Sequence, residues 1–322
     1  MNIRRALLLL SLLALPLVAL AQNYPNRYIR LVVPYPAGGV ADTMARPLAN
    51  KLADILGQPI VVDNRPGGNT IIGSALVAKA PADGYTIGIT SLTHYMMPFF
   101  FKDVPFDTMK DFTPIAEIAV IANMLAINPA LPIHSVKELI EYAKKNPGKL
   151  MYGTPGIGGQ QQLAGMLLAQ AAGIELVHVP YKGGNQAITD CIGGQLPMLM
   201  LGSPNLLPQV RAGKLRALAV TESRRSPNSP EVPTVGETIP GYAIPPVWFG
   251  LLGPAGMPKA VVDRLSVALR QALASPEIKR NLEGRGFEMI ENPPSPEAFV
   301  NEIKVDTEAI RKIVTAAGVK PE

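Results

Sequence analysis

The sequence predicts an α/β protein in which mainly parallel sheets carry helices on both faces. Short apolar runs rich in β-branched residues alternate with helical patterns along most of the chain. Strands that are separated by helices connect through crossovers, and this places neighbouring strands parallel in one sheet. The chain of 322 residues is also long enough to form two domains, each with its own core.

The expected elements follow one another in this alternating order. Apolar runs predict strands at 29–33, 60–64, 86–90, 115–127, 150–153, 176–179, 198–201, 215–221 and 248–253. Helical periodicity predicts helices at 41–56, 70–80, 136–146, 160–173, 185–193, 259–274, 276–285 and 296–317. The first of these helices contains Pro47, which removes a backbone hydrogen bond and predicts a kink or a later start.

The N-terminal segment is typical of a secretory signal peptide. Arg4-Arg5 precede an apolar stretch that begins at Ala6 and ends in Ala-Leu-Ala at 19–21. The stretch is short for a membrane anchor, and Pro16 interrupts it. We expect cleavage after Ala21, and since no cysteine follows directly, we expect no lipoprotein anchor.

Composition excludes several classes of function. Without the two arginines of the signal peptide, 28 basic residues face 25 acidic ones, a balance too even to favour nucleic acid. No later segment is long and apolar enough to span a bilayer. The single cysteine, Cys191, cannot form an internal disulfide and is expected to be a small buried side chain.

Loops rich in glycine follow several of the expected strands. The stretch "VVPYPAGGVAD" at 32–42 turns from a strand into a helix without the Lys of a P-loop. Related loops are "YGTPGIGGQQQLAG" at 152–165 and "ITSLTHYMM" at 89–97. Free backbone N–H groups at such strand ends favour an anion, and ligands of α/β sheets bind there. We therefore expect these loops to form one shared binding cleft.

A short sequence pattern occurs once in each half of the chain, and we call it the internal echo. Val33-Pro34-Tyr35 followed by Gly38-Gly39 recurs as Val179-Pro180-Tyr181 followed by Gly183-Gly184. The echo indicates either a duplicated loop that faces its copy across a cleft or a chance similarity. Asp42 and Asp190 lie in the helices after the two loops, and both are expected to order the loops rather than touch ligand.

Catalytic signatures are absent from the sequence. The three histidines are not spaced as metal ligands, and no G-x-S-x-G elbow is present, so we expect neither an enzyme, a metal nor a cofactor. Of the histidines, His94 is placed near the cleft and His178 is interpreted as structural. Trp248 either packs under the hinge or lines the cleft.

Taken together, the signal peptide and the stretches "YPNRYIRLVVPYPAGGVAD", "VVDNRPGGNTIIGSALVAKAPADGYTI", "VPYKGG", "RAGKLRALAVT" and "WFGLLGPAGMP" carry a resemblance. They resemble the substrate-binding proteins of tripartite tricarboxylate transporters, the Bug family first described from Bordetella. The resemblance implies a monomeric periplasmic protein with the two-domain, type II periplasmic-binding-protein fold. It also implies a cleft that closes on a small carboxylate ligand.

The resemblance implies that domain one comprises 22–124 and 245–322, that domain two comprises 125–244, and that the chain crosses at 122–125 and 243–247. It places the carboxylate between loops of both domains, held largely by backbone groups. With His94 and Ser203 added, the predicted ligand-binding residues are Tyr35, Pro36, Ala37, Gly38, Gly39, Val40, Ser91, Thr93, His94, Thr154, Gly156, Gly158, Gly159, Tyr181, Lys182, Gly183 and Ser203.

The sequence departs from the family pattern toward a less polar pocket. Ala41 stands where a hydroxyl residue is usual, and "LPMLMLGSPN" replaces a more polar segment. This favours an aromatic or longer aliphatic acid, such as terephthalate, over citrate. Three functions remain open: a receptor that delivers its ligand to the membrane components of a tripartite transporter, a receptor for a sensor, and an exported enzyme that uses the same cleft.

Overall fold

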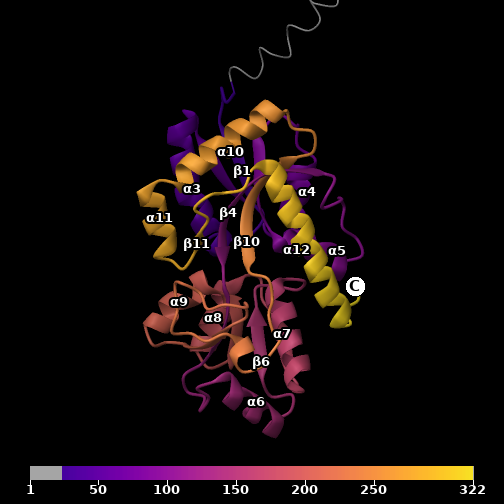
Figure 1. The fold of residues 1–322 in the computed structure, drawn as a ribbon, viewed down its shortest axis with the longest axis vertical. Helices are drawn as coiled ribbons and strands as arrows, with labels where there is room; N and C mark the ends of the chain where they lie inside the picture. The colour runs from indigo at the N-terminus through magenta and orange to yellow at the C-terminus, as the bar shows by residue number, and fades with distance from the viewer. Residues whose placement is uncertain (1–23, 322) are drawn as a thin grey trace, which may run out of the picture.

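The computed structural model describes residues 24–321 and has two α/β lobes, one above the other in Figure 1. We call the part built on the six-stranded sheet the first lobe and the part built on the five-stranded sheet the second lobe. The predicted signal peptide and its cleavage site lie outside the described residues. Among the described residues, no helix has the length and apolarity that a membrane crossing requires.

The first lobe is a sheet with the strand order β11-β4-β10-β3-β1-β2. Its strands are β1 (Ile29–Val33), β2 (Ile60–Asn64), β3 (Thr86–Ser91), β4 (Phe112–Ile121), β10 (Val247–Pro254) and β11 (Glu288–Met289). Its helices are α3 (Val40–Leu56), α4 (Ile71–Ala78), α5 (Leu92–Phe100), α10 (Lys259–Leu273), α11 (Pro276–Glu283) and α12 (Pro296–Ala316).

The second lobe is a sheet with the order β7-β6-β8-β5-β9. Its strands are β5 (Asn123–Ile127), β6 (Met151–Thr154), β7 (Val177–Pro180), β8 (Met198–Gly202) and β9 (Arg216–Val220). Its helices are α6 (Val136–Lys145), α7 (Gln160–Ala172), α8 (Gly184–Ile192) and α9 (Ser203–Arg211), and a short 3₁₀ turn, η1, spans Val235–Glu237.

Both sheets combine parallel and antiparallel strand pairs, whereas the sequence predicted mainly parallel sheets. Strand β1 is parallel to β2 and β3, and β6 is parallel to β7 and β8. In contrast, β10 and β5 are antiparallel to both of their neighbours. These two strands enter their sheets from the other lobe, so they run against the strands that are joined by crossover helices. The α/β alternation of the sequence does not reveal this reversal of direction.

The two lobes repeat one order of elements. The series β1–α3–β2–α4–β3–α5 and the series β6–α7–β7–α8–β8–α9 occupy matching places in their sheets. The loop after β1 therefore corresponds to the loop after β6, and the loop after β2 corresponds to the loop after β7. The echo between 33–39 and 179–184 joins loops that are not counterparts, so it does not record a duplicated loop.

The chain crosses between the sheets twice, and the two crossings lie side by side. The single strand expected at 115–127 is broken at Ala122, so that β4 and β5 belong to different sheets. Ile121 at the end of β4 pairs with Val247 at the start of β10. The backbone N–H of Thr221 donates to the carbonyl oxygen of Asn123 at 3.0 Å, which ties the return segment to the first crossing.

Several helix predictions need correction. Helix α3 begins at Val40 and continues through Pro47, so a later start is wrong. Helices α5 and α9 were not predicted, because each contains an internal proline, Pro98 or Pro208. Helix α12 packs on β4 and α5 of the first lobe, and its end reaches α7 of the second lobe, where Gln170 Nε2 lies 3.5 Å from the Ala316 carbonyl oxygen.

Candidate ligand-binding site

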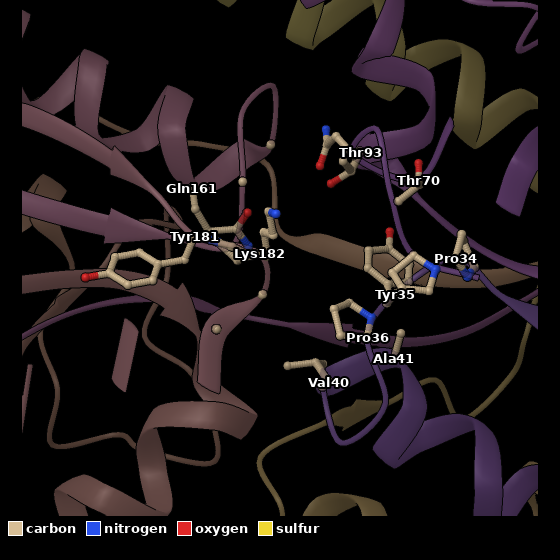
Figure 2. A pocket seen from close by; sticks show the side chains of 18 of the residues that line it. Pro34, Tyr35, Pro36, Val40, Ala41, Thr70, Thr93, Gln161, Tyr181 and Lys182 are labelled. Carbon is tan, nitrogen blue, oxygen red and sulfur yellow. The ribbon is translucent and has the colours of Figure 1, made fainter. Parts of the chain in front are cut away.

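A cavity of about 780 Å³ lies between the two lobes. Its walls are the loops that follow the carboxyl ends of β1, β2 and β3 in the first lobe and of β6, β7 and β8 in the second. This is where α/β sheets bind ligands. Figure 2 shows Tyr35, Pro36 and Thr93 on one side of the gap and Gln161 and Lys182 on the other.

Six helices begin at this cavity, three from each lobe. Their N-cap residues all line it, and only Ser91 caps its helix with a side chain, by accepting a hydrogen bond from the Thr93 N–H. The other five helix starts keep their first N–H groups free of a side-chain cap, and together with the helix dipoles these groups favour an anion. These five N-caps are Gly39, Thr70, Gly159, Gly183 and Gly202.

In the first lobe, Asp42 fixes the loop after β1. Gly38 has a left-handed backbone with φ of 73°, and its N–H donates to Asp42 Oδ2 at 2.8 Å. Arg46 Nε and Asn64 Nδ2 donate to the same carboxylate, both at 2.9 Å. Burial raises the pKa of Asp42, but these hydrogen bonds outweigh burial and leave the pKa below its usual range. The contact with Gly38 is the loop-ordering bond expected of Asp42.

In the second lobe, Gln162 accepts the equivalent hydrogen bond in the loop after β6. Gly158 has a φ of 78°, and its N–H donates to Gln162 Oε1 at 2.7 Å. In both loops a left-handed glycine thus precedes an N-cap glycine and donates to the side chain four residues later. The sequence did not reveal this match, because a carboxylate in one loop is replaced by a neutral amide in the other.

The loops of the two lobes meet at the mouth of the cavity. Asn185 Nδ2 donates to the Gly38 carbonyl oxygen at 3.4 Å across the gap. A Cβ atom at Gly183 would lie 3.1 Å from Pro36 Cγ, a tight contact, and the φ of 108° at this position also favours glycine. The structure therefore has its two lobes in contact around the cavity.

The cavity contains little charge. Among the described residues that line it, Lys182 is the one charged residue, and its side chain is exposed. Tyr35 Oη and Ser91 Oγ are 2.7 Å apart. Burial raises the pKa of Tyr35 to about 12, although the Ser91 contact lowers it, so the phenol is neutral. The remaining walls include apolar side chains from both lobes and the crossings, namely Phe101, Ile121, Ile157, Val247 and Phe249.

Most of the predicted site residues line the cavity. They come from all four of the loops that the resemblance assigned to the two domains. These residues are Tyr35, Pro36, Gly39, Val40, Ser91, Thr93, Gly156, Gly159, Tyr181, Lys182 and Gly183.

Six predicted residues lie outside the cavity lining. Ala37 and Gly38 face solvent, and Gly158 is buried against Phe100 and Phe101. Thr154 is buried, with Oγ1 donating to the Gly156 carbonyl oxygen, and Ser203 Oγ donates to that of Gly286.

His94 is the clearest correction among the six. It lies in α5 between Phe106 and Phe112, and its Nδ1 is 3.1 Å from Ser74 Oγ. Burial lowers its pKa to about 3, although a hydrogen bond to the Thr108 backbone raises it, so the ring is neutral. The sequence showed a polar residue after a strand but not which face of α5 would carry it.

Trp248 and Tyr181 make contacts that stabilise the protein itself. Trp248 packs on Tyr95 and Phe299 and donates from Nε1 to Asp306 Oδ2 at 2.8 Å, so it does not line the cavity. Tyr181 donates from Oη to Asp190 Oδ2 at 2.8 Å. Figure 2 shows the Tyr181 ring pointing away from the gap. Asp190 therefore orders its loop through the tyrosine ring.

The prediction missed polar residues of the loops after β2 and β7. Asn69 and Asn185 line the cavity at equivalent places, each after a glycine pair. The repeated Gly-Gly-Asn in "PGGNT" and "KGGNQ" was the signal that could have found them. The prediction also missed Thr70, Gln161 and Asn205.

Two lobes joined by paired crossings, with a cavity of helix N-termini and a single lysine between them, define a solute-binding receptor. The chain belongs to the tripartite tricarboxylate transporter receptor family, whose model matches residues 44–315. The structure and this match therefore confirm the fold and family that the sequence resemblance implied. Members of this family are receptors and not enzymes, so an enzyme is excluded.

Relatives from bacteria are similar over most of their length. A UPF0065 protein in the tcbD-tcbE intergenic region of Pseudomonas sp. is 37% identical over 293 residues, covering 90% of this chain and 86% of the relative. Protein BugT of Bordetella pertussis is 33% identical over 288 residues, covering 87% of each chain.

Solved structures have the same fold. Rpa4515 of R. palustris with adipate is 33% identical with a TM-score of 0.88, covering 93% of this chain and all of that one. MatC from Rhodopseudomonas palustris with bound malate is 27% identical with a TM-score of 0.84, covering 90% of this chain and all of that one.

Proposed function

We propose that the protein is a periplasmic receptor that captures a small carboxylate and delivers it to the membrane components of a tripartite tricarboxylate-type transporter. The observation that carries the proposal is the set of six helix starts around one cavity with a single lysine. Backbone N–H groups and helix dipoles stabilise an anion without a full countercharge. A site of this kind releases its ligand more readily than a buried ion pair would.

The ligand class follows from the walls of the cavity. Apolar side chains from both lobes line the cavity, among them Phe101, Ile157 and Phe249. This lining suits a longer aliphatic or aromatic acid better than citrate. The adipate in the structure of Rpa4515 supports an aliphatic diacid of similar length.

Release of the ligand requires the two lobes to move apart, and the two crossings act as the hinge for this movement. The proposed hinge consists of 122–125 and 243–247, with domain boundaries at 124 and 244. Both crossings are single extended segments, so a small change of backbone angles there moves one lobe relative to the other. The direct contacts between the lobes at Gly38 and Gly183 break in the open form.

The proposal is tested by thermal unfolding of the mature monomer, from residue 22 onward, after removal of bound ligand by unfolding and refolding. The ligands are adipate, terephthalate, malate and citrate, each beside its neutral amide. An acid at a hundred times its dissociation constant stabilises the fold by about 2.7 kcal/mol, whereas its amide does not. Stabilisation by the amides alone would show that the cavity binds a neutral solute.

The choice between a transporter and a sensor is tested separately. Ligand-loaded receptor, cross-linked in cells of its native host, is expected to capture the membrane components of a tripartite transporter. Capture of a sensor instead would contradict the transport step and leave the binding step intact.

A further inference from the structure

Gln161 and Asn123 form a pair of side-chain amides at the inner end of the cavity. Gln161 lies in the first turn of α7 and lines the cavity, and its Nε2 donates to Asn123 Oδ1 at 2.8 Å. Asn123 directly follows the first crossing. The tip of Gln161 therefore lies on the crossing side of the cavity, which Ile121 and Val247 also line.

The backbone N–H and carbonyl oxygen of Asn123 are both hydrogen-bonded in this structure. Its N–H donates to Glu222 Oε1 at 2.7 Å, and its carbonyl oxygen accepts from the Thr221 N–H at 3.0 Å. The residue has no exposed surface. The side-chain amide is thus the part of Asn123 that is free to turn.

The amide of Asn123 has an unused donor. Among the described residues, none accepts a hydrogen bond from its buried Nδ2. A buried N–H without an acceptor is rarer and more costly than a buried carbonyl oxygen without a donor. The observed orientation therefore keeps the less favourable of the two groups unpaired, while Gln161 offers a ligand its acceptor Oε1 and the one N–H of Nε2 that Asn123 does not use.

A half-turn of both amides removes this cost and keeps the bond between them. Asn123 Nδ2 then donates to Gln161 Oε1, and Gln161 Nε2 becomes free for the ligand. The observed orientation of the pair offers a ligand an acceptor beside one N–H, whereas the turned orientation places both N–H groups of Gln161 toward the ligand. The helix N-termini, in contrast, offer donors only.

We propose that Gln161, oriented by Asn123, is a specificity-determining residue that binds the second polar group of a two-ended ligand. The inference rests on the proposed function, in which the helix N-termini hold the first carboxylate. The turned pair donates to a second carboxylate, and the observed pair accepts from a hydroxyl. A ligand with an apolar second end satisfies neither orientation.

The test compares three acids that differ only at the second end, namely adipate, 6-hydroxyhexanoate and hexanoate, by titration calorimetry. The terephthalate series, with 4-(hydroxymethyl)benzoate and 4-methylbenzoate, is run in parallel. Wild-type protein is expected to bind the diacid and the hydroxy acid at least tenfold more tightly than the apolar acid. Gln161→Met is expected to reduce this preference to less than threefold, whereas Gln170→Met, the same change farther along α7, keeps it.

Asn123→Asp separates the two orientations. An aspartate only accepts hydrogen bonds, so it holds Gln161 Nε2 and leaves Oε1 toward the ligand. Diacid affinity should fall at least tenfold more than hydroxy-acid affinity. Circular dichroism checks folding, because the introduced carboxylate lies beside Glu222, and the Gln161→Met result decides the inference if this variant does not fold.

The outcomes distinguish this inference from the proposed function. Unchanged preference in Gln161→Met, or equal losses for both ligands in a folded Asn123→Asp variant, overturns the inference and leaves carboxylate binding intact. Wild-type protein that binds the acids of both series without preferring a second polar end also overturns it. Wild-type protein that binds none of these acids overturns the inference together with the proposed ligand class.

Discussion

The loop after β1 and the loop after β6 have the same backbone geometry, but the side chain that orders the loop is charged in the first and neutral in the second. Each places a left-handed glycine before an N-cap glycine and closes on the side chain four residues later. In the first lobe that side chain is the carboxylate of Asp42, and in the second it is the neutral amide of Gln162. The comparison shows that the fold needs an acceptor at this position, whereas the charge of the acceptor is free to differ.

The difference in charge makes the two lobes unequal partners for an anion. Asp42 places a negative charge in the first turn of α3, which offsets the dipole of that helix. None of the cavity helices of the second lobe, α7, α8 and α9, has an acidic residue in its first turn, and Lys182 precedes α8. We therefore expect the start of α7 to attract a carboxylate more strongly than the start of α3.

The largest expected effect comes from replacing the left-handed glycines. Gly158→Ala forces an alanine to φ near 78° and places its Cβ 2.9 Å from Phe101 Cε2. Gly38→Ala has a similar φ, but its Cβ meets only Asn185 Nδ2, at 3.5 Å. We expect losses of about 3 and about 1 kcal/mol in the free energy of unfolding. Equal losses in urea titrations would contradict the difference in packing.

The next effect concerns Asp42. Asp42→Ala removes the acceptor for Gly38 and Asn64, and we expect a loss of about 2 kcal/mol at pH 7. Because the folded protein holds the pKa of Asp42 below its usual range, its stabilisation is present at neutral pH and is lost as the pH falls toward that lowered pKa. Urea titrations at pH 7 and pH 3.5 should therefore show a smaller difference between variant and wild type at the lower pH. A difference that grows at pH 3.5 would contradict the sign.

A third change makes the second lobe resemble the first. Gln162→Glu keeps an acceptor for Gly158 and adds a negative charge at the start of α7. We expect about fivefold weaker binding of adipate, from about 1 kcal/mol of helix-dipole interaction, with little change in stability. Calorimetry with Gln162→Met as the uncharged control measures this effect. Equal weakening in both variants would assign the loss to loop geometry instead of charge.

The smallest effect is expected from Lys182. Its side chain is exposed, so water and salt screen its interaction with a bound anion. We expect Lys182→Gln to weaken adipate binding about twofold at low salt and less at 0.5 M salt. A tenfold loss that persists at high salt would show that Lys182 makes a direct, dehydrated contact with the ligand.

The sequence predicted those elements whose hydrophobic pattern lies within one short segment of the chain. Alternating apolar runs located the strands at 29–33 and 60–64 to the residue, and one apolar face located α10. The glycine pairs located three of the loops that line the cavity, and the polar residues after the strand at 86–90 located a fourth. These features depend on neighbouring residues, so the amino-acid pattern is sufficient to reveal them.

The sequence did not predict what depends on distant residues. The reversed directions of β5 and β10 and the inward face of α5 that removes His94 from the cavity result from packing between segments far apart in the chain. The same is true of the bond between Gln161 and Asn123, which joins a helix start to a crossing strand. The apolar run at 115–127 did not reveal the break at Ala122, although the resemblance placed a crossing at 122–125. The sequence by itself determined the family and the glycine-led starts of α3, α7 and α8, because each depends on residues that are close together in the chain. The tertiary structure decided which polar side chains line the cavity, because that depends on how the two sheets meet.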